Sequence, residues 1–161
     1  GWLYTGDIEH FDSDGYLMIT KKKKSLMKTS GGKYVSPTQI EDLILSLQYV
    51  ENAMVIGNER MYITAIMTAD KNGMIKFAER NNISFGTFSE LLSNRTLLKL
   101  IQKDIDRMQK DLANYERIRK FTLVENHFSI EGGELTPTLK VKRKFVEEKF
   151  KDEIDNMYLK I

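Results

Sequence analysis

The sequence predicts an α+β fold, in which a small antiparallel hairpin unit precedes a three-stranded sheet covered by helices. Short apolar runs bounded by polar and glycine turns predict the strands, and apolar residues spaced three and four apart predict the helices. The chain has 161 residues, of which 41% are hydrophobic and 30% charged. This length and balance are typical of a globular domain with its own core.

The first expected elements are short strands. The run "GYLMIT" at residues 15–20 follows the turn-like "DSDG" and predicts a strand. The runs "SLMKT" and "KYV" flank Gly31 and Gly32, so they predict an antiparallel pair around a glycine turn. The surrounding "KTSGGKYVSP" is not a Walker phosphate loop, because Met27 and Tyr34 stand where that motif needs a glycine and a Ser or Thr.

A helix is expected to begin at Ser36. The serine hydroxyl can cap the helix, Pro37 suits the first helical position, and Gln39 can bond back to the cap. The apolar stripe of this helix comprises Ile40, Leu43, Ile44 and Leu47.

The larger sheet is expected from three runs. Residues 53–57 and 62–68 are separated by a short polar loop and predict a hairpin, and residues 120–124 supply a third strand. Between the second and third runs, helices are expected at 72–80 and 95–112, and the apolar residues of the second helix recur every three or four residues.

The C-terminal part reads as a loop followed by a helix. The loop is the glycine- and proline-containing "EGGELTPT", and the helix runs from Arg143 onward. Its apolar face comprises Val146, Phe150, Ile154 and Met157.

Charge is nearly balanced overall, with 25 basic and 23 acidic residues, but it is concentrated locally. The two basic clusters are Lys21, Lys22, Lys23, Lys24, Lys28 and Lys33, and Lys140, Lys142, Arg143 and Lys144. Such clusters are typical of solvated surfaces. The alternative is a basic module that binds RNA or anionic lipid, although the first cluster has almost no interleaved aromatics to stack on bases.

Several function classes are excluded by residues that the chain lacks. Without cysteine there is no disulfide, thiolate metal site or cysteine nucleophile, and His10 and His127 lie far apart, so no metal held by protein alone is expected. No apolar run approaches a membrane span and no secretory signal is present, so we expect a cytoplasmic protein. The opening "GWLYTGD" lacks an initiator Met, which suggests a fragment of a longer protein.

Four stretches then occur in order: "YTGD", "KTSGGKYVSP", "YERIRKFTLV" and "ELTPTLKVKRK". Together they resemble the C-terminal end of the adenylate-forming superfamily, in particular the long-chain fatty acid–CoA ligases. The resemblance implies that residues 1–20 are the tail of a large N-terminal adenylation domain, otherwise missing here. Residues 21–161 would be the small C-terminal lid domain.

The resemblance implies nucleotide-binding and hinge roles near the N-terminus. The carboxylate of Asp7 would accept hydrogen bonds from the ribose hydroxyls of ATP. Lys21 would be the hinge about which the lid rotates. Lys22 would stand where an arginine usually reaches the ribose. Lysine is a point charge and lacks the planar guanidinium of arginine, so the contact could be weaker or differently aimed. The alternative to a ribose contact is that Lys22 is a solvated surface lysine.

The same resemblance implies two sites on the lid. Ser30, Gly31 and Gly32 would line the passage for the pantetheine arm of CoA, since residues with little or no side chain let a thin ligand approach the backbone. Lys140 would be the catalytic lysine, which neutralises the charge that builds up as a carboxylate attacks the α-phosphate.

The resemblance implies an AMP-forming ligase as the full enzyme. It would join a fatty acid and ATP into an acyl-adenylate with loss of pyrophosphate, and the CoA thiol would then displace AMP. Mg²⁺ would accompany ATP, held mostly by its phosphates and by the missing large domain. The fragment alone would be inactive.

Two alternatives stay open. The acyl acceptor could be a carrier-protein thiol, and the full enzyme could attach peripherally to the inner face of a membrane. No nucleic acid partner is expected.

Overall fold

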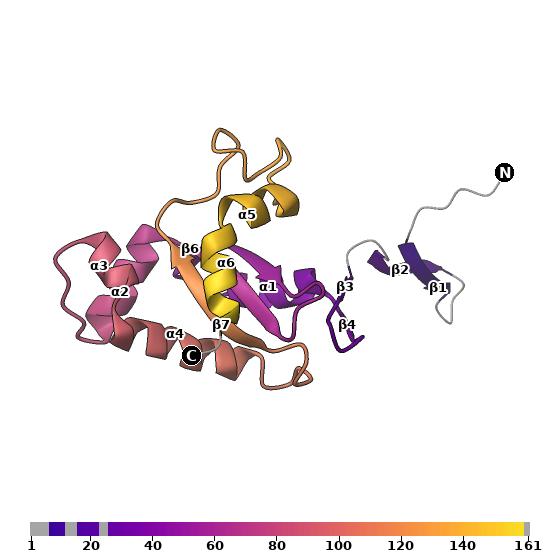
Figure 1. Ribbon diagram of the computed structural model, residues 1–161, viewed down its shortest axis with the longest axis horizontal. Helices are drawn as coiled ribbons and strands as arrows, with labels where there is room; N and C mark the ends of the chain where they lie inside the picture. The colour runs from indigo at the N-terminus through magenta and orange to yellow at the C-terminus, as the bar shows by residue number, and fades with distance from the viewer. Residues whose placement is uncertain (1–6, 12–15, 23–25, 160–161) are drawn as a thin grey trace.

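The computed structural model describes residues 7–11, 16–22 and 26–159, which form three small sheets and six helices (Figure 1). In chain order the elements are β1 (Asp7–Phe11), β2 (Leu17–Lys22), β3 (Met27–Lys28), β4 (Tyr34–Val35), α1 (Pro37–Leu45), β5 (Val50–Ile56), β6 (Ile63–Ala69), α2 (Lys71–Arg80), α3 (Phe88–Leu92), α4 (Arg95–Met108), β7 (Ile118–Val124), α5 (Arg143–Lys149) and α6 (Lys151–Tyr158).

The three-stranded sheet has the order β5-β6-β7. β5 and β6 pair antiparallel, which confirms the predicted hairpin, whereas β7 pairs parallel to β6. A parallel pair requires a crossover, and α2, α3 and α4 lie in that connection. β6 is the central strand, and every one of its residues is buried. The predicted third strand is therefore confirmed, and the strand order places β7 at one edge of the sheet.

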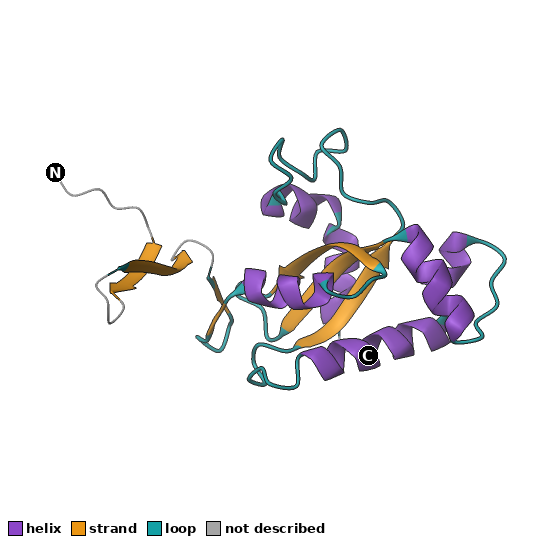
Figure 2. Cartoon of the chain, turned by 180° about the vertical axis from the view of Figure 1, so that it is seen from behind, coloured by secondary structure: helices purple, strands orange, loops and turns teal. Residues whose placement is uncertain are grey.

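Helices cover both faces of this sheet (Figure 2). Side chains alternate along β6: Ala65 and Met67 contribute to one hydrophobic core, and Ile66 contributes to the other. The first core also takes its buried residues from α1, α2, α3 and α4, and the second from α5 and α6. The predicted α+β class, with a hairpin unit before a helix-covered three-stranded sheet, is confirmed.

Helix boundaries follow local capping only in part. Pro37 occupies the first turn of α1 as predicted, but the Ser36 side chain makes no capping hydrogen bond, so that part of the prediction is wrong. α3 was not predicted; Thr87 and Glu90 form a capping box at its start. α4 ends at Met108, before the predicted 112, because the buried Gln109 side chain bonds both the N–H and the C=O of Ile118.

The C-terminal helix is interrupted at Phe150, where a single helix was predicted. Phe150 ends α5 and begins α6 with φ −108° and ψ 30°, and its ring lies 6.0 Å from that of Phe128. The helix changes direction there, as Figure 1 shows, and Val146 on α5 and Ile154 on α6 both lie in the second core, as the predicted apolar face requires.

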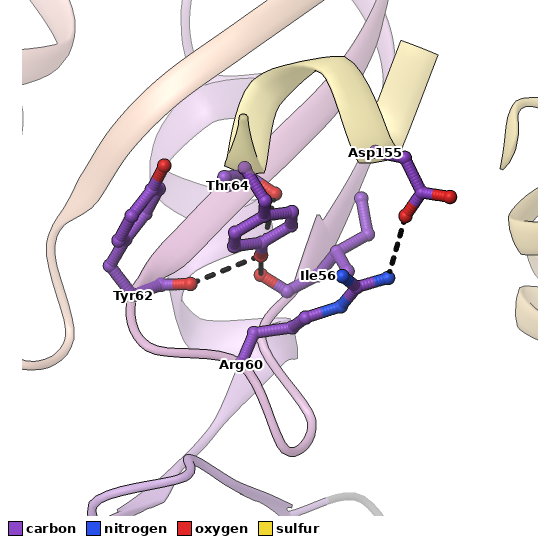
Figure 3. Close-up of polar contacts among 6 residues, drawn as sticks. Ile56, Arg60, Tyr62, Thr64 and Asp155 are labelled. Carbon is purple, nitrogen blue, oxygen red and sulfur yellow. Dashed lines mark hydrogen bonds and ion pairs between the residues drawn. The ribbon is translucent and has the colours of Figure 1, made fainter. Parts of the chain in front are cut away.

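Tyr158 fixes the end of α6 to the sheet (Figure 3). Its hydroxyl lies 3.0 Å from the Thr64 hydroxyl and can donate to the Tyr62 carbonyl at 3.0 Å. The Arg60 guanidinium lies 4.6 Å from the centre of the Tyr158 ring and pairs with Asp155 at 3.0 Å. Burial raises the pKa of Tyr158, so the hydroxyl remains a neutral donor at physiological pH.

Candidate functional site

The glycine turn, residues 29–33 between β3 and β4, is closed by its own backbone. Thr29 N–H donates to the Lys33 carbonyl at 2.9 Å, and Gly32 N–H donates to the Thr29 carbonyl at 2.9 Å. The buried Thr29 hydroxyl also accepts from Lys33 N–H at 3.2 Å. Ser30, Gly31 and Gly32 form the exposed tip, and Gly32 has φ +77°. The predicted turn is confirmed, and the Gly32 position disfavours any residue with a Cβ atom.

The glycine turn is attached to the β5–β6 loop. Ser30 N–H donates to the Arg60 carbonyl at 3.0 Å, and Glu59 N–H donates to the Lys28 carbonyl at 2.8 Å. Lys28 N–H also donates to the Asn58 side chain at 3.3 Å. These bonds join the turn and β3 to the loop between β5 and β6, so the turn is expected to move with the domain as one body.

A cleft of about 530 Å³ is lined by Met61, Tyr62, Asn114, Tyr115, Arg119 and Lys120. Lys33 of the glycine turn lies 5.8 Å from the centre of the Tyr115 ring, which places the cleft beside the turn. The stretch "YERIRKFTLV" contributed to the resemblance, but none of its side chains was predicted as a site residue. The signal that points to the cleft is an aromatic residue, Tyr115, followed closely by the basic Arg119 and Lys120, because such a set can stack on a ring and bind an anion.

The lysine hairpin, residues 135–141, carries the predicted catalytic lysine. Leu135 and Val141 form an antiparallel bridge at its base. Within it, Thr136 N–H donates to the Lys140 carbonyl at 2.8 Å, and Lys140 N–H donates to the Thr136 hydroxyl at 3.0 Å. The Lys140 side chain is exposed, and no other described residue pairs with its ammonium group. Its position is fixed by backbone bonds while its charge stays available to a ligand.

A buried carboxylate secures the start of this hairpin. Glu134 is 3% exposed, accepts a hydrogen bond from Ser129 N–H at 3.1 Å and pairs with the Lys149 ammonium. Burial alone raises the pKa of the Glu134 carboxyl, but the bonds from Lys149 and Ser129 outweigh it and hold the pKa below its ordinary value. Glu134 is therefore ionised and anchors the hairpin to α5.

We expect Lys149→Met to lower the free energy of unfolding of this domain by about 1–3 kcal/mol near pH 7, because it leaves the Glu134 carboxylate buried without its partner. The range lies below that for a fully buried pair, since the Lys149 side chain is 42% exposed. Because the folded-state pKa of Glu134 is lowered, the stabilisation is complete above its ordinary value of 4.5 and is lost as the pH falls through the folded-state pKa.

Urea unfolding at several pH values measures the free energy of unfolding of Lys149→Met. The control is Lys144→Met, which changes an exposed lysine of the same helix. Equal stability of the two variants at pH 7 would contradict the role given to the Glu134–Lys149 pair.

The end of the lysine hairpin is fastened to the sheet through Arg143. Its guanidinium donates to the Val55 carbonyl at 3.0 Å and pairs with Glu41 of α1, which itself accepts from Val55 N–H at 2.8 Å. The arginine therefore ties α5, α1 and β5 together directly after the hairpin.

The two turns stand on opposite faces of the sheet. Met27 and Val35, which flank the glycine turn, belong to the core covered by α1 and α4. Leu135, at the base of the lysine hairpin, belongs to the core covered by α5 and α6. The turns lie apart in both Figures 1 and 2. The predicted lysine and glycine residues are thus not brought into one site.

The predicted residues near the N-terminus lie on the β1–β2 hairpin. Asp7 is the register partner of Lys22, and Ile8 is the partner of Lys21, with an irregularity directly after Ile8. Asp7 and Lys22, both predicted to contact the nucleotide, are therefore paired across the two strands. Lys23 and Lys24 lie outside the described residues.

Neither a metal cluster nor a membrane-spanning helix was found in the described part of the chain. Its acidic and histidine side chains form no group of three placed to hold an ion. None of its helices has both the length and the apolar character needed to cross a bilayer.

Residues 24–161 match the family model described as AMP-binding enzyme C-terminal domain. The chain is 36% identical over 161 residues to long-chain-fatty-acid–CoA ligase FadD15 of Mycobacterium tuberculosis, covering 99% of this chain and 27% of that protein. It is 35% identical to human long-chain-fatty-acid–CoA ligase 6, covering 98% of this chain and 23% of the relative. The chain thus spans about a quarter of the length of these curated relatives.

Solved structures share the fold. The adenylation domain of a carboxylate reductase from Mycobacterium chelonae superposes with a TM-score of 0.75 at 23% identity, covering 96% of this chain and 22% of that one. A fatty acyl CoA synthetase of Mycobacterium tuberculosis gives a TM-score of 0.52 at 26% identity, covering 93% of this chain and 24% of that chain.

Proposed function

The chain belongs to the AMP-binding enzyme C-terminal domain family, and on that premise we propose that it is the lid of an AMP-forming long-chain fatty acid–CoA ligase. Residues 1–20 are assigned to the tail of a large adenylation domain and residues 21–161 to the lid. The family match starts at residue 24, which supports a boundary near Lys21. The names of relatives that align with nearly the whole chain support the substrate class.

The proposed reaction has two steps. A fatty acid carboxylate oxygen attacks the α-phosphorus of ATP, and pyrophosphate leaves. The CoA sulfur, after losing its proton, then attacks the acyl carbon, and AMP leaves. Mg²⁺ would accompany ATP, held mostly by the phosphates and by the large domain, and would neutralise phosphate charge there.

The observation that carries this proposal is the exposed Lys140 on a hairpin with fixed ends. Glu134 secures the hairpin to α5 at one end, and Arg143 secures it to the sheet at the other. A cation held in this way needs little reorganisation to meet the charge that develops at the α-phosphate. We assign Lys140 to adenylate formation.

We assign the glycine turn to CoA binding. Ser30, Gly31 and Gly32 are exposed at its tip, so a thin pantetheine arm can lie against backbone. The adjacent cleft offers the Tyr115 ring together with the cations of Arg119 and Lys120. This set suits the anionic nucleotide end of the same CoA molecule.

The nucleotide and hinge roles are assigned to the β1–β2 hairpin. Asp7 is proposed to accept hydrogen bonds from the ribose, and its register partner Lys22 to contribute a positive charge beside it. Lys21 is proposed as the hinge. With Lys140 on one face and the glycine turn on the other, rotation about Lys21 would present each site in turn to the large domain.

In the intact enzyme we expect Asp7→Ala to raise the KM for ATP by about tenfold or more, because it removes a charged acceptor from ribose hydroxyls. Transfer of a supplied acyl-adenylate to CoA should change less. Initial-rate kinetics with varied ATP measure the effect, with Asp7→Asn as the variant that keeps one acceptor oxygen. An unchanged ATP dependence would contradict the ribose assignment.

Product analysis tests the whole proposal. The intact enzyme is incubated with a long-chain fatty acid, ATP, Mg²⁺ and CoA, and AMP, pyrophosphate and acyl-CoA are quantified. Equal amounts of the three products are expected. If the enzyme forms the adenylate but no acyl-CoA, and transfers the acyl group only when a carrier protein with a pantetheine thiol is added, then the carrier protein and not CoA is the acyl acceptor.

A further inference from the structure

Leu139, the residue directly before Lys140, has two features that are unfavourable for an isolated domain. Its side chain is 69% exposed to solvent. Its backbone has φ +59°, the left-handed region that leucine rarely adopts. Both features are found at the tip of the lysine hairpin.

The hydrogen bonds of the hairpin require this backbone conformation. Leu139 N–H donates to the Thr136 carbonyl at 2.8 Å, and Thr136 N–H donates to the Lys140 carbonyl at 2.8 Å. Glycine or asparagine would satisfy the same geometry with less steric strain. The hairpin itself therefore gives no reason for a leucine here, and conflicts of this kind between residue and local structure are typical of functional sites.

We propose that Leu139 is a docking residue, which inserts into an apolar surface of the large adenylation domain when the lid adopts its adenylate-forming orientation. The proposal rests on the assignment of Lys140 above. The surface belongs to the remainder of the same protein, because the chain accounts for only 27% and 23% of the length of its relatives. Since Leu139 and Lys140 are consecutive, burial of the first brings the second to the same surface.

The hairpin can transmit such docking to the rest of the lid. Glu134 and Arg143 bind its two ends to α5 and to the sheet, so the anchored tip and the domain move together. Leu139 thus acts as a positioning residue that favours one lid orientation. Full burial of one leucine corresponds to a change of about ten- to a hundredfold in the population of that orientation.

The test uses Leu139→Gly, Leu139→Asn and Leu139→Met in the intact enzyme. Glycine and asparagine relieve the backbone strain but remove the apolar side chain, whereas methionine keeps an apolar side chain of similar volume. Adenylate formation is measured by pyrophosphate exchange, and the second step by CoA capture of supplied acyl-adenylate. We expect the glycine and asparagine variants to lose pyrophosphate exchange about ten- to a hundredfold, and the methionine variant to retain it within about threefold.

All three variants are expected to keep CoA capture, which shows that the lid is folded. Normal pyrophosphate exchange in Leu139→Gly and Leu139→Asn would overturn the proposal, and so would a loss shared equally by Leu139→Met. A Lys140→Ala variant, assayed in the same way, distinguishes failure of the catalytic role of Lys140 from failure of the docking role of Leu139. If that variant keeps full pyrophosphate exchange, the assigned role of Lys140 fails; if it loses exchange while Leu139→Gly does not, only the docking role fails.

Discussion

Lys140→Ala in the intact enzyme is expected to lower the rate of acyl-adenylate formation by about two to three orders of magnitude, the scale for removing one preorganised charge partner. The lysine is exposed at a hairpin closed by bonds of 2.8 and 3.0 Å to Thr136, so truncation removes charge without removing a structural contact. Conversion of supplied acyl-adenylate to acyl-CoA should be nearly unchanged. Pyrophosphate exchange and CoA capture measure the two steps separately.

The matched control is Lys144→Ala. Lys144 belongs to the same basic cluster and is exposed on α5, but it lies outside the hairpin. This variant should retain both steps within about twofold, as is usual for a solvated surface lysine. An equal loss in Lys140→Ala and Lys144→Ala would mean that the cluster acts through its general field, not through one placed cation.

Gly31→Leu is expected to have the opposite effect, with CoA capture lowered by about ten- to a hundredfold, the cost of forcing a side chain into a fitted passage. A Cβ atom at Gly31 would meet only the Thr29 hydroxyl, at an ordinary 3.9 Å, so the fold should accept leucine. Adenylate formation should persist, because the glycine turn and the lysine hairpin are built on opposite cores.

Gly31 is a better position for this test than Gly32. A leucine at Gly32 would have open space but would have to adopt φ +77°, so backbone strain would accompany any effect on CoA. Gly31→Ala is the graded control and should lower CoA capture less than leucine does. If Gly31→Leu lost both steps in proportion, a folding defect or a single shared site would explain the data better than two separate faces.

The sequence by itself determined the elements that depend on neighbouring residues. Pro37 marked the first turn of α1, Gly31 and Gly32 marked the turn between β3 and β4, and the apolar spacing located α4. Each of these is set within one turn of backbone by φ preference or by side-chain periodicity. The four short motifs also indicated the family correctly.

Long-range packing decided what local preference could not. Directly after α4, the Gln109 amide binds the first residue of β7 nine residues later, and the C-terminal helix is interrupted at Phe150, whose ring lies near that of Phe128. Arg143 reaches Glu41 across 102 residues of sequence. No pattern within a single element encodes such contacts, since they form only once the helices pack on the sheet.

The tertiary structure likewise decided how the candidate sites are arranged. The sequence placed Lys140 on a loop and the glycines on a turn, but it did not show that their bases pack on opposite faces of one sheet. Nor did it show that Lys33 brings Tyr115 to the glycine turn, or that Leu139 has a positive φ. The physical reason is that residue type sets which chemistry a position can offer. Relative position and backbone strain arise from strand direction and hydrogen-bond closure in the folded chain.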